Sequence, residues 1–182
     1  MTLPKPSLRV VLASLCLAAL PVTGLAQTGN PVANALKGTL RGSASKMTAA
    51  AEKMPADKYS FRPTAGSRTF GELVLHIANS NGAMCHWLSG AAPAGKINLT
   101  AASPKAQLVD ALRKSFAYCS SALQNFSDSD LSKQVDFFGG HKVSAAALVL
   151  SLTDDWADHY SQEAAYLRRN GMLPPTAHGG QP

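Results

Sequence analysis

Apolar side chains recur every three or four positions along four stretches of the chain, which is the spacing of one face of an α-helix. The stretches cover residues 31–53, 69–88, 103–126 and 144–170. Two have clear ends. Ser103 is a helix cap followed by Pro104 at the first helical position, and Gly171 follows the last stretch. The pattern predicts four long helices.

The remaining segments read as connections. None alternates apolar and polar residues for the length of a strand, so the sequence predicts no sheet, only one short extended piece within residues 127–143. Four amphipathic helices bury their apolar faces against one another, so the fold class is all-α, a four-helix bundle. Residues 89–103 form a loop rich in Gly, Ala and Pro, long enough to return along a whole helix. This predicts a crossover that leaves the second and third helices parallel.

The first residues have the pattern of a signal peptide. Lys5 and Arg9 precede the uncharged apolar residues 10–20, and small residues stand before a cut after Ala26. A lipoprotein cut before Cys16 is the alternative, but Leu15 occupies a position that requires a small residue. We therefore expect a signal peptide over residues 1–26, one bundle domain over residues 27–182, and a secreted or periplasmic protein.

The charge of the remaining chain excludes some partners. Residues 27–182 carry 15 basic and 11 acidic side chains, a net charge of +4, and the basic residues are scattered. Nucleic-acid binding requires a basic patch or stripe, so none is expected. No second apolar run is long enough to span a bilayer, so stable membrane insertion after signal cleavage is not expected either. A small-molecule substrate or ligand remains as the expected partner, and a homodimer is left open.

Cys85 and Cys119 remain after the predicted cleavage, both on apolar helix faces. Each lies about fifteen residues into its helix, so they are level only if the two helices are parallel. In an oxidising compartment this arrangement predicts a disulfide, and two free buried cysteines are the alternative. The absence of a Cys-x-x-Cys motif excludes a zinc knot of that type.

Three polar residues lie on the margins of apolar helix faces. Asp155 and His159 are four residues apart on the fourth predicted helix and continue the strip of Leu148 and Leu152. His76 lies beside the core face of the second helix. Two histidines and a carboxylate from separate helices form a three-ligand metal set that leaves positions open for water or substrate. The alternative is an ordinary hydrogen-bonded histidine beside a local Asp–His pair.

Other polar residues are weaker candidates. Glu163 lies one turn beyond His159 and is either a fourth ligand, a general base, or the partner of a buried tyrosine or arginine. His86 points about 80° away from His76 around the helix, which separates the two rings. His141 belongs to the predicted turn, and His178 to the tail.

Two segments resemble a known family. "RTFGELVLHIANSNGAMCHWL" (residues 68–88) and "DDWADHYSQEAAYLRRNGMLPP" (residues 154–175) look like the DinB/YfiT-like superfamily of metal-dependent bundle proteins. The most specific element is H-Y-x-Q-x-x-x-Y-L-R-x-N-G-x-x-P-P, from His159 to Pro175. The resemblance covers most of the chain after the predicted signal peptide.

The resemblance implies a divalent-metal site made by one histidine of the second helix and an H-x-x-x-H pair on the fourth. His76 matches the first position and His159 the last, while Asp155 stands in the middle position. A carboxylate is also a ligand for zinc, nickel, manganese or iron, but it makes the set harder and adds a negative charge.

The resemblance leaves the activity open. Some relatives are thiol-dependent transferases, which fits an exported protein poorly, because it meets little reduced thiol. Others are hydrolases or isomerases of small thiol conjugates. Three functions follow: a metal-dependent hydrolase or transferase acting on a small molecule, a non-catalytic ligand-binding or metal-binding protein, or a structural bundle whose site has decayed at Asp155. The catalytic residues are not predicted.

Overall fold

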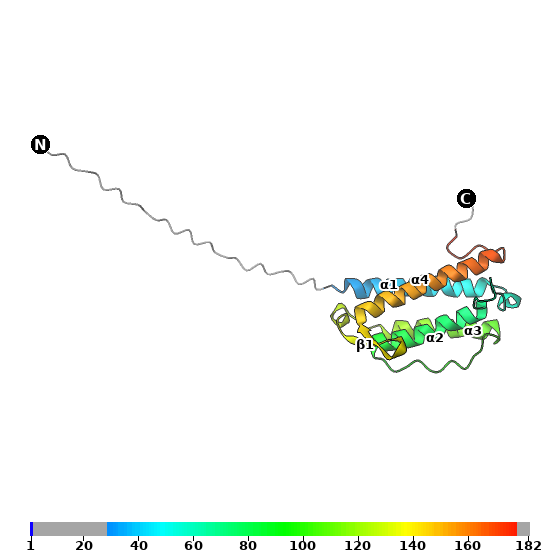
Figure 1. Ribbon diagram of the computed structural model, residues 1–182, viewed down its shortest axis with the longest axis horizontal. Coiled ribbons are helices and arrows are strands. Elements are labelled where there is room, and N and C mark those ends of the chain that lie inside the picture. Colours follow the sequence, from blue (N-terminus) through cyan, green and yellow to red (C-terminus); the bar gives the residue numbers. More distant parts are fainter. Residues whose placement is uncertain (2–28, 178–182) are drawn as a thin grey trace.

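The computed structural model describes Met1 and residues 29–177 (Figure 1). The predicted signal peptide, apart from Met1, and His178 lie outside the described residues. The described part is a bundle of four long helices with one small sheet at its end. The prediction of a four-helix bundle is confirmed.

The first two helices begin and end at chemically clear positions. α1 (Pro31–Lys53) starts with proline in its first turn and stops at Met54, the residue before Pro55. α2 (Phe70–Ser89) begins with a capping box, in which Thr69 and Glu72 each accept a hydrogen bond from the other's backbone N–H. It ends at Gly90, whose φ of 68° lies in the left-handed region. The short 3₁₀ helix η1 (Ala56–Lys58) lies between them.

The third helix is shorter than predicted. α3 (Lys105–Ala122) begins one residue after Pro104 and ends four residues before Phe126. The predicted cap at Ser103 is wrong: Pro104 is the N-cap, and the Ser103 hydroxyl accepts a hydrogen bond from the Thr100 N–H in the preceding loop. Residues 123–126 leave the α-helix because tighter bonds replace the helical ones, with Phe126 N–H donating to the Leu123 carbonyl at 3.1 Å. The 3₁₀ helix η2 (Asp128–Asp130) follows. α4 (Ala145–Arg169) is capped by the Ser144 hydroxyl and is followed by Gly171, as the sequence predicts.

The prediction that no sheet forms is wrong. β1 (Gln134–Asp136) and β2 (Lys142–Ser144) pair antiparallel, joined by the 3₁₀ turn η3 (Phe138–Gly140). Gly139 and Gly140 have φ of 74° and 76°, a conformation that glycine adopts without strain, and they reverse the chain. Strands of three residues are too short to show a period of two, so hydropathy alone does not reveal them.

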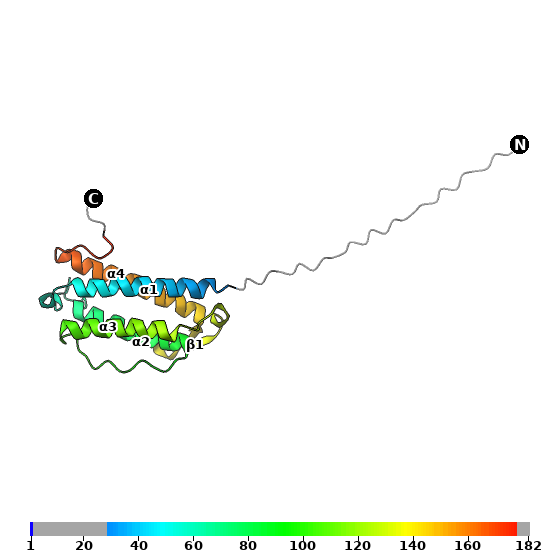
Figure 2. The ribbon, with the colours of Figure 1, turned by 180° about the vertical axis from the view of Figure 1, so that it is seen from behind.

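The predicted crossover is confirmed. Residues 90–104 run along the outside of the bundle from the end of α2 to the start of α3, so these two helices point the same way (Figures 1 and 2). The Asn81 amide contacts the Ser115 hydroxyl, and Cys85 is bonded to Cys119. Both pairs are separated by 34 residues, and only parallel helices keep such a constant difference.

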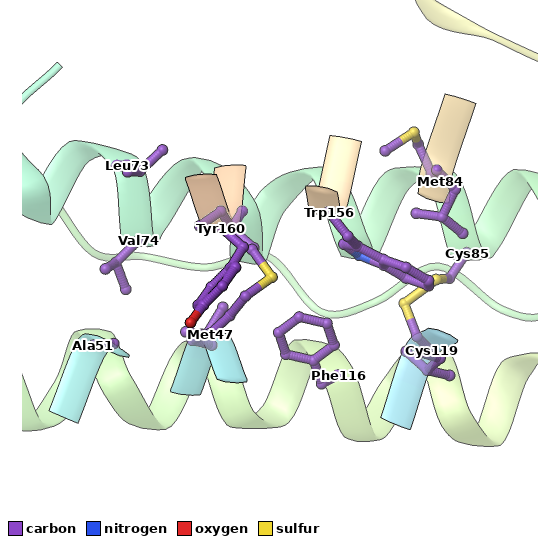
Figure 3. Close-up of a cluster of buried hydrophobic side chains, with 14 of the residues drawn as sticks. Met47, Ala51, Leu73, Val74, Met84, Cys85, Phe116, Cys119, Trp156 and Tyr160 are labelled. Atoms are coloured by element: carbon purple, nitrogen blue, oxygen red, sulfur yellow. A yellow bond between two sulfur atoms is a disulfide. The ribbon is translucent and has the colours of Figure 1, made fainter. Parts of the chain in front are cut away.

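The core lies between the four helices, and the Cys85–Cys119 disulfide crosses it from α2 to α3 (Figure 3). The Cα atoms of the two cysteines are 5.3 Å apart, in the usual range for a disulfide. The expected core face of α4 is buried, including Trp156, which is fully enclosed. In the part of the chain that the structure describes, no helix has the length and apolar character needed to cross a membrane.

Candidate metal centre

His76, Asp155 and His159 converge between α2 and α4. One potential ligand atom from each lies within 4.8 Å of those of the other two. The two imidazole rings meet edge to face, with centroids 4.8 Å apart. Side-chain exposure is 7% for His159 and 21% for Asp155, and His76 is half-buried. The margins of two core-facing helix surfaces therefore meet, as the sequence pattern predicts.

Asp155 and His159 lie side by side. The Asp155 Oδ1 and His159 Nε2 atoms are 3.1 Å apart, yet neither nitrogen of the His159 ring takes part in a hydrogen bond among the described residues. Two ligands bound at about 2.0–2.2 Å to one tetrahedral or octahedral ion lie about 3–3.5 Å from each other. The separation therefore suits two electron-pair donors that share a cation.

Unpartnered polar atoms concentrate on this stretch of α4. Among the described residues, five buried side-chain atoms have no hydrogen-bond partner, and all belong to Asp155, His159 and Glu163. Buried polar groups in folded proteins are nearly always paired, because an unpaired one costs about 1–3 kcal/mol. A cation held between Asp155 Oδ1 and His159 Nε2 would give the unpaired Nε2 atom a partner, so these residues fit a metal.

The electrostatic surroundings keep His76 in the form that binds metal. Burial lowers the pKa of His76 first, and the nearby Arg68 and His159 lower it further, while Asp155 acts in the opposite direction. Neutral imidazole is the ligand form, because protonation occupies the lone pair that binds the ion. His76 is therefore ready to coordinate near neutral pH without first losing a proton.

Asp158 is a residue that the sequence analysis missed. Its Oδ2 lies 3.5 Å from Nδ1 of His159, the ring nitrogen turned away from Asp155, and the same oxygen accepts a 2.7 Å hydrogen bond from Gln162. Metal-bound histidines usually donate their second N–H to a carboxylate, which fixes the ring. An acid directly before His159 is the only signal in the sequence, and adjacency alone is weak.

Glu163 is one turn further along α4 and is fully buried. It is not among the three residues whose ligand atoms converge. Both carboxyl oxygens lack a hydrogen-bond partner among the described residues, so pairing with a buried tyrosine or arginine is absent. Burial raises the pKa of Glu163 well above its usual value, so this carboxyl favours the protonated form.

The remaining described histidines lie apart from this centre. His86 is held by a 2.6 Å hydrogen bond between its Nδ1 and the Ala91 carbonyl. His141 is exposed in the turn between β1 and β2. Neither belongs to the converging group.

The fold and the site define the class of this protein as a four-helix bundle with potential metal ligands between α2 and α4. The model of the DinB superfamily matches residues 39–162, which include all three candidate ligands. The chain belongs to the DinB superfamily.

Three solved structures share the fold. A DinB-like protein (YjoA) of Bacillus subtilis is 21% identical, with a TM-score of 0.64, over 82% of this chain and 96% of that one. A DinB-like protein of Bacillus cereus is 19% identical, with the same TM-score, over 78% and 97%. A conserved protein of Enterococcus faecalis is 18% identical, with a TM-score of 0.60, over 74% and 94%. At these identities the likeness concerns the fold alone. None of the curated proteins matches this chain in sequence.

Proposed function

We propose that this protein is an exported metal-dependent hydrolase of a small molecule, with a divalent ion held by His76, Asp155 and His159. The observation that carries the proposal is the convergence of three potential ligand atoms within 4.8 Å, at residues Asp155 and His159 that have buried side-chain atoms without a hydrogen-bond partner among the described residues. The bundle domain proposed for residues 27–182 contains all of it.

The ligand set limits the metal. Two neutral imidazoles and one carboxylate suit zinc, nickel, manganese or iron, and three protein ligands leave positions open for water or substrate. When bound, such an ion acts as a Lewis acid and lowers the pKa of its water toward neutrality. Asp155 contributes a negative charge to the centre, and Asp158 is positioned to orient the His159 ring.

Hydrolysis is the activity that we favour among those open to the family. Water is always present outside the cytosol, whereas the reduced thiols required by a thiol transferase are scarce there. The Cys85–Cys119 disulfide supports export, because disulfides persist in oxidising compartments. Export is tested on protein recovered from the periplasm or medium. Its mass should correspond to a chain that begins at Gln27 if cleavage follows Ala26.

Metal content tests the centre. Purified protein should hold about one equivalent of metal, and His159→Ala and His76→Ala should each weaken binding more than the roughly 10–100-fold expected for loss of an outer partner. His86→Ala is the matched control on α2, because His86 lies outside the converging group. Unchanged metal content in both ligand variants, with helix content retained, would overturn the proposed centre.

Asp155→His tests the departure from the usual ligand pattern. The variant should still bind metal, because imidazole replaces carboxylate at the same helical position, but its preference should move toward softer ions. Competition between zinc and manganese, measured on both proteins, reads out the change. An identical preference would mean that Asp155 does not touch the ion.

Turnover separates the enzyme from a non-catalytic binding protein. Metal-loaded protein should hydrolyse at least one member of a panel of small esters, amides and thiol conjugates, and chelation should abolish the rate. Metal binding without turnover across the panel would favour the binding protein, and absence of metal binding would favour the structural bundle.

A further inference from the structure

The candidate centre reaches the surface through a depression that carries positive charge. His76 is the one converging residue that lines it, and the depression has a volume of about 640 Å³. Arg62 and Arg68, from the connector before α2, line the same depression, together with Glu72. A molecule that approaches His76 from this side therefore meets two guanidinium groups.

The two arginines differ in their availability. Arg62 lies 3.7 Å from the Glu72 carboxylate, which offsets part of its charge. Arg68 has neither an ion-pair nor a side-chain hydrogen-bond partner within residues 29–177 and is exposed. Its backbone is nevertheless held, since the Tyr166 hydroxyl on α4 donates a 2.6 Å hydrogen bond to the Arg68 carbonyl. A fixed backbone with an unpaired guanidinium is well suited to bind a carboxylate or a phosphate.

A second hollow continues from this depression along α2. Asn79 lines both, and the second groove, of about 820 Å³, lies between α2, α3 and the crossover loop. His76, Asn79, Ala83 and His86 follow one another at helical spacing, so one strip of α2 forms the floor from the centre into the groove. At 1.5 Å per residue, Ala83 lies about 10 Å along the axis from His76.

The groove is largely apolar, with Lys96, Asp110 and Lys114 as its charged lining residues. Gly82 allows the crossover loop to lie close to α2, because a Cβ on this residue would stand only 3.2 Å from the Ala94 side chain. The apolar residues that line the groove include Ala78, Ala83, Pro93, Ile97, Leu99 and Ala111. Apolar grooves of a few hundred Å³ with a few placed polar groups are typical small-molecule sites.

We propose that the substrate is an amphipathic anion, whose carboxylate or phosphate is held by Arg68 next to the metal centre and whose apolar body lies in the groove beneath the crossover loop. This rests on the proposed function for the role of the centre, but the binding of the anion and of the apolar body is measured separately. A fully extended chain of about eight carbons spans the axial distance from His76 to Ala83.

The test combines substitutions of Arg68 and of the groove with four probes. Octanoate carries both features, acetate only the charge, and 1-octanol only the chain; octyl phosphate distinguishes a phosphate from a carboxylate. Arg68→Gln should weaken octanoate binding about tenfold, the cost of one charge-assisted hydrogen bond at an exposed site, and leave 1-octanol unchanged. Arg68→Lys should recover part of the loss, because lysine keeps the positive charge but lacks the planar guanidinium that binds a carboxylate through two hydrogen bonds.

Ala83→Phe should fill the groove and weaken octanoate and 1-octanol at least tenfold while leaving acetate unchanged. Ala111→Phe on α3 repeats this test from the opposite wall, in case Ala83→Phe does not fold. Arg41→Gln on α1 is the control with the same change of net charge away from both hollows. Calorimetric titration on folded, disulfide-bonded protein gives each affinity.

The outcomes are separable from those of the metal proposal. Each titration is run on metal-loaded and on chelated protein, so a protein that binds no metal still reports on Arg68 and the groove. Equal octanoate affinity in wild type and Arg68→Gln, or equal loss in Arg41→Gln, would overturn the anion site. Octanoate binding no tighter than acetate, or no detectable binding of any probe, would overturn the proposal as a whole.

Discussion

Two polar clusters are buried in this bundle, and they are built in opposite ways. The Asn81 cluster consists of Asn81, Ser115 and Trp156, and each donates or accepts a hydrogen bond within it. The Trp156 indole N–H donates to Asn81 Oδ1 at 2.7 Å, and Asn81 Nδ2 donates to Ser115 Oγ at 3.0 Å. The α4 cluster consists of Asp155, His159 and Glu163, and its buried atoms lack such partners within residues 29–177.

The contrast teaches what each cluster is for. Trp156 and Asp155 are neighbours on the same helix, so helix propensity does not explain the difference. A closed network fixes the positions of α2, α3 and α4 and stabilises the fold. A cluster with unpaired polar atoms lowers the stability of the metal-free protein, and such a cluster is expected where a bound ligand pairs with those atoms. The α4 cluster therefore has the properties of a site, and the Asn81 cluster those of a structural contact.

The largest expected effect concerns the disulfide, one turn beyond the Asn81 cluster on both helices. Replacing Cys85 and Cys119 together by alanine should lower the free energy of unfolding by about 3–4 kcal/mol, because the bridge closes a long loop in the unfolded chain. Urea unfolding measures it. Reductant should destabilise the wild type and leave the double variant unaffected, and two alkylatable thiols in non-reduced protein would contradict the bridge.

The closed cluster should respond next most strongly. Asn81→Leu should destabilise by about 2–4 kcal/mol, because it leaves the Trp156 indole N–H buried without an acceptor and removes the donor to Ser115. Asn79→Leu, an exposed position on the same helix, is the control and should change stability by less than about 0.5 kcal/mol. Similar effects at both positions would remove the distinction between a network and a surface amide.

The open cluster should respond with the opposite sign. Glu163→Met keeps the volume and removes an unpaired carboxyl, so metal-free protein at pH 5 should gain about 1–3 kcal/mol. Thermal unfolding of wild type and variant measures the gain. A loss of stability would show that Glu163 has a partner that satisfies it, and the contrast between the clusters would fail.

The pH dependence sharpens this prediction. Because burial raises the pKa of Glu163 in the folded protein, the folded state binds its proton more tightly than the unfolded state does. The stability from this group is complete below its ordinary pKa of 4.5 and is lost as pH rises toward the folded pKa. The advantage of Glu163→Met over wild type should therefore grow above pH 5, by at most about 1.4 kcal/mol per pH unit. A constant difference would contradict the raised pKa.

The smallest effect is expected outside both clusters. Arg113 on α3 pairs with Glu52 on α1, but both side chains are about half exposed. Arg113→Gln should cost no more than about 1 kcal/mol, since water screens such pairs. A larger loss would mean that polarity, and not burial, governs the difference between the two clusters.

The fold was accessible from the sequence because its signals are long. Helices of eighteen residues or more repeat the apolar period several times, and Gly171 marks the end of the last one. The two-stranded sheet was missed because three-residue strands carry no such repeat. The end of α3 was missed because residues 123–126 continue the helical spacing of the sequence, while their backbone hydrogen bonds change to the shorter 3₁₀ type.

The candidate centre was accessible for a different reason. Positions on helix margins follow from the 100° step, so His76, Asp155 and His159 are placed by arithmetic together with the family resemblance. Arg68 and the groove were not, because the connector before α2 and the crossover loop have no periodicity. Their position relative to His76 depends on tertiary packing, such as the hydrogen bond from Tyr166 to the Arg68 carbonyl.

The crossover loop has a further consequence for the integrity of the chain. Residues 90–104 run along the outside of the bundle, in the kind of segment that proteases cut first. Cys85 lies before this loop and Cys119 after it, so a single nick produces two pieces that stay covalently joined. The nicked protein keeps its mass under non-reducing conditions and separates into two fragments only when the bridge is reduced. Cleavage within this loop thus leaves all four helices in one molecule.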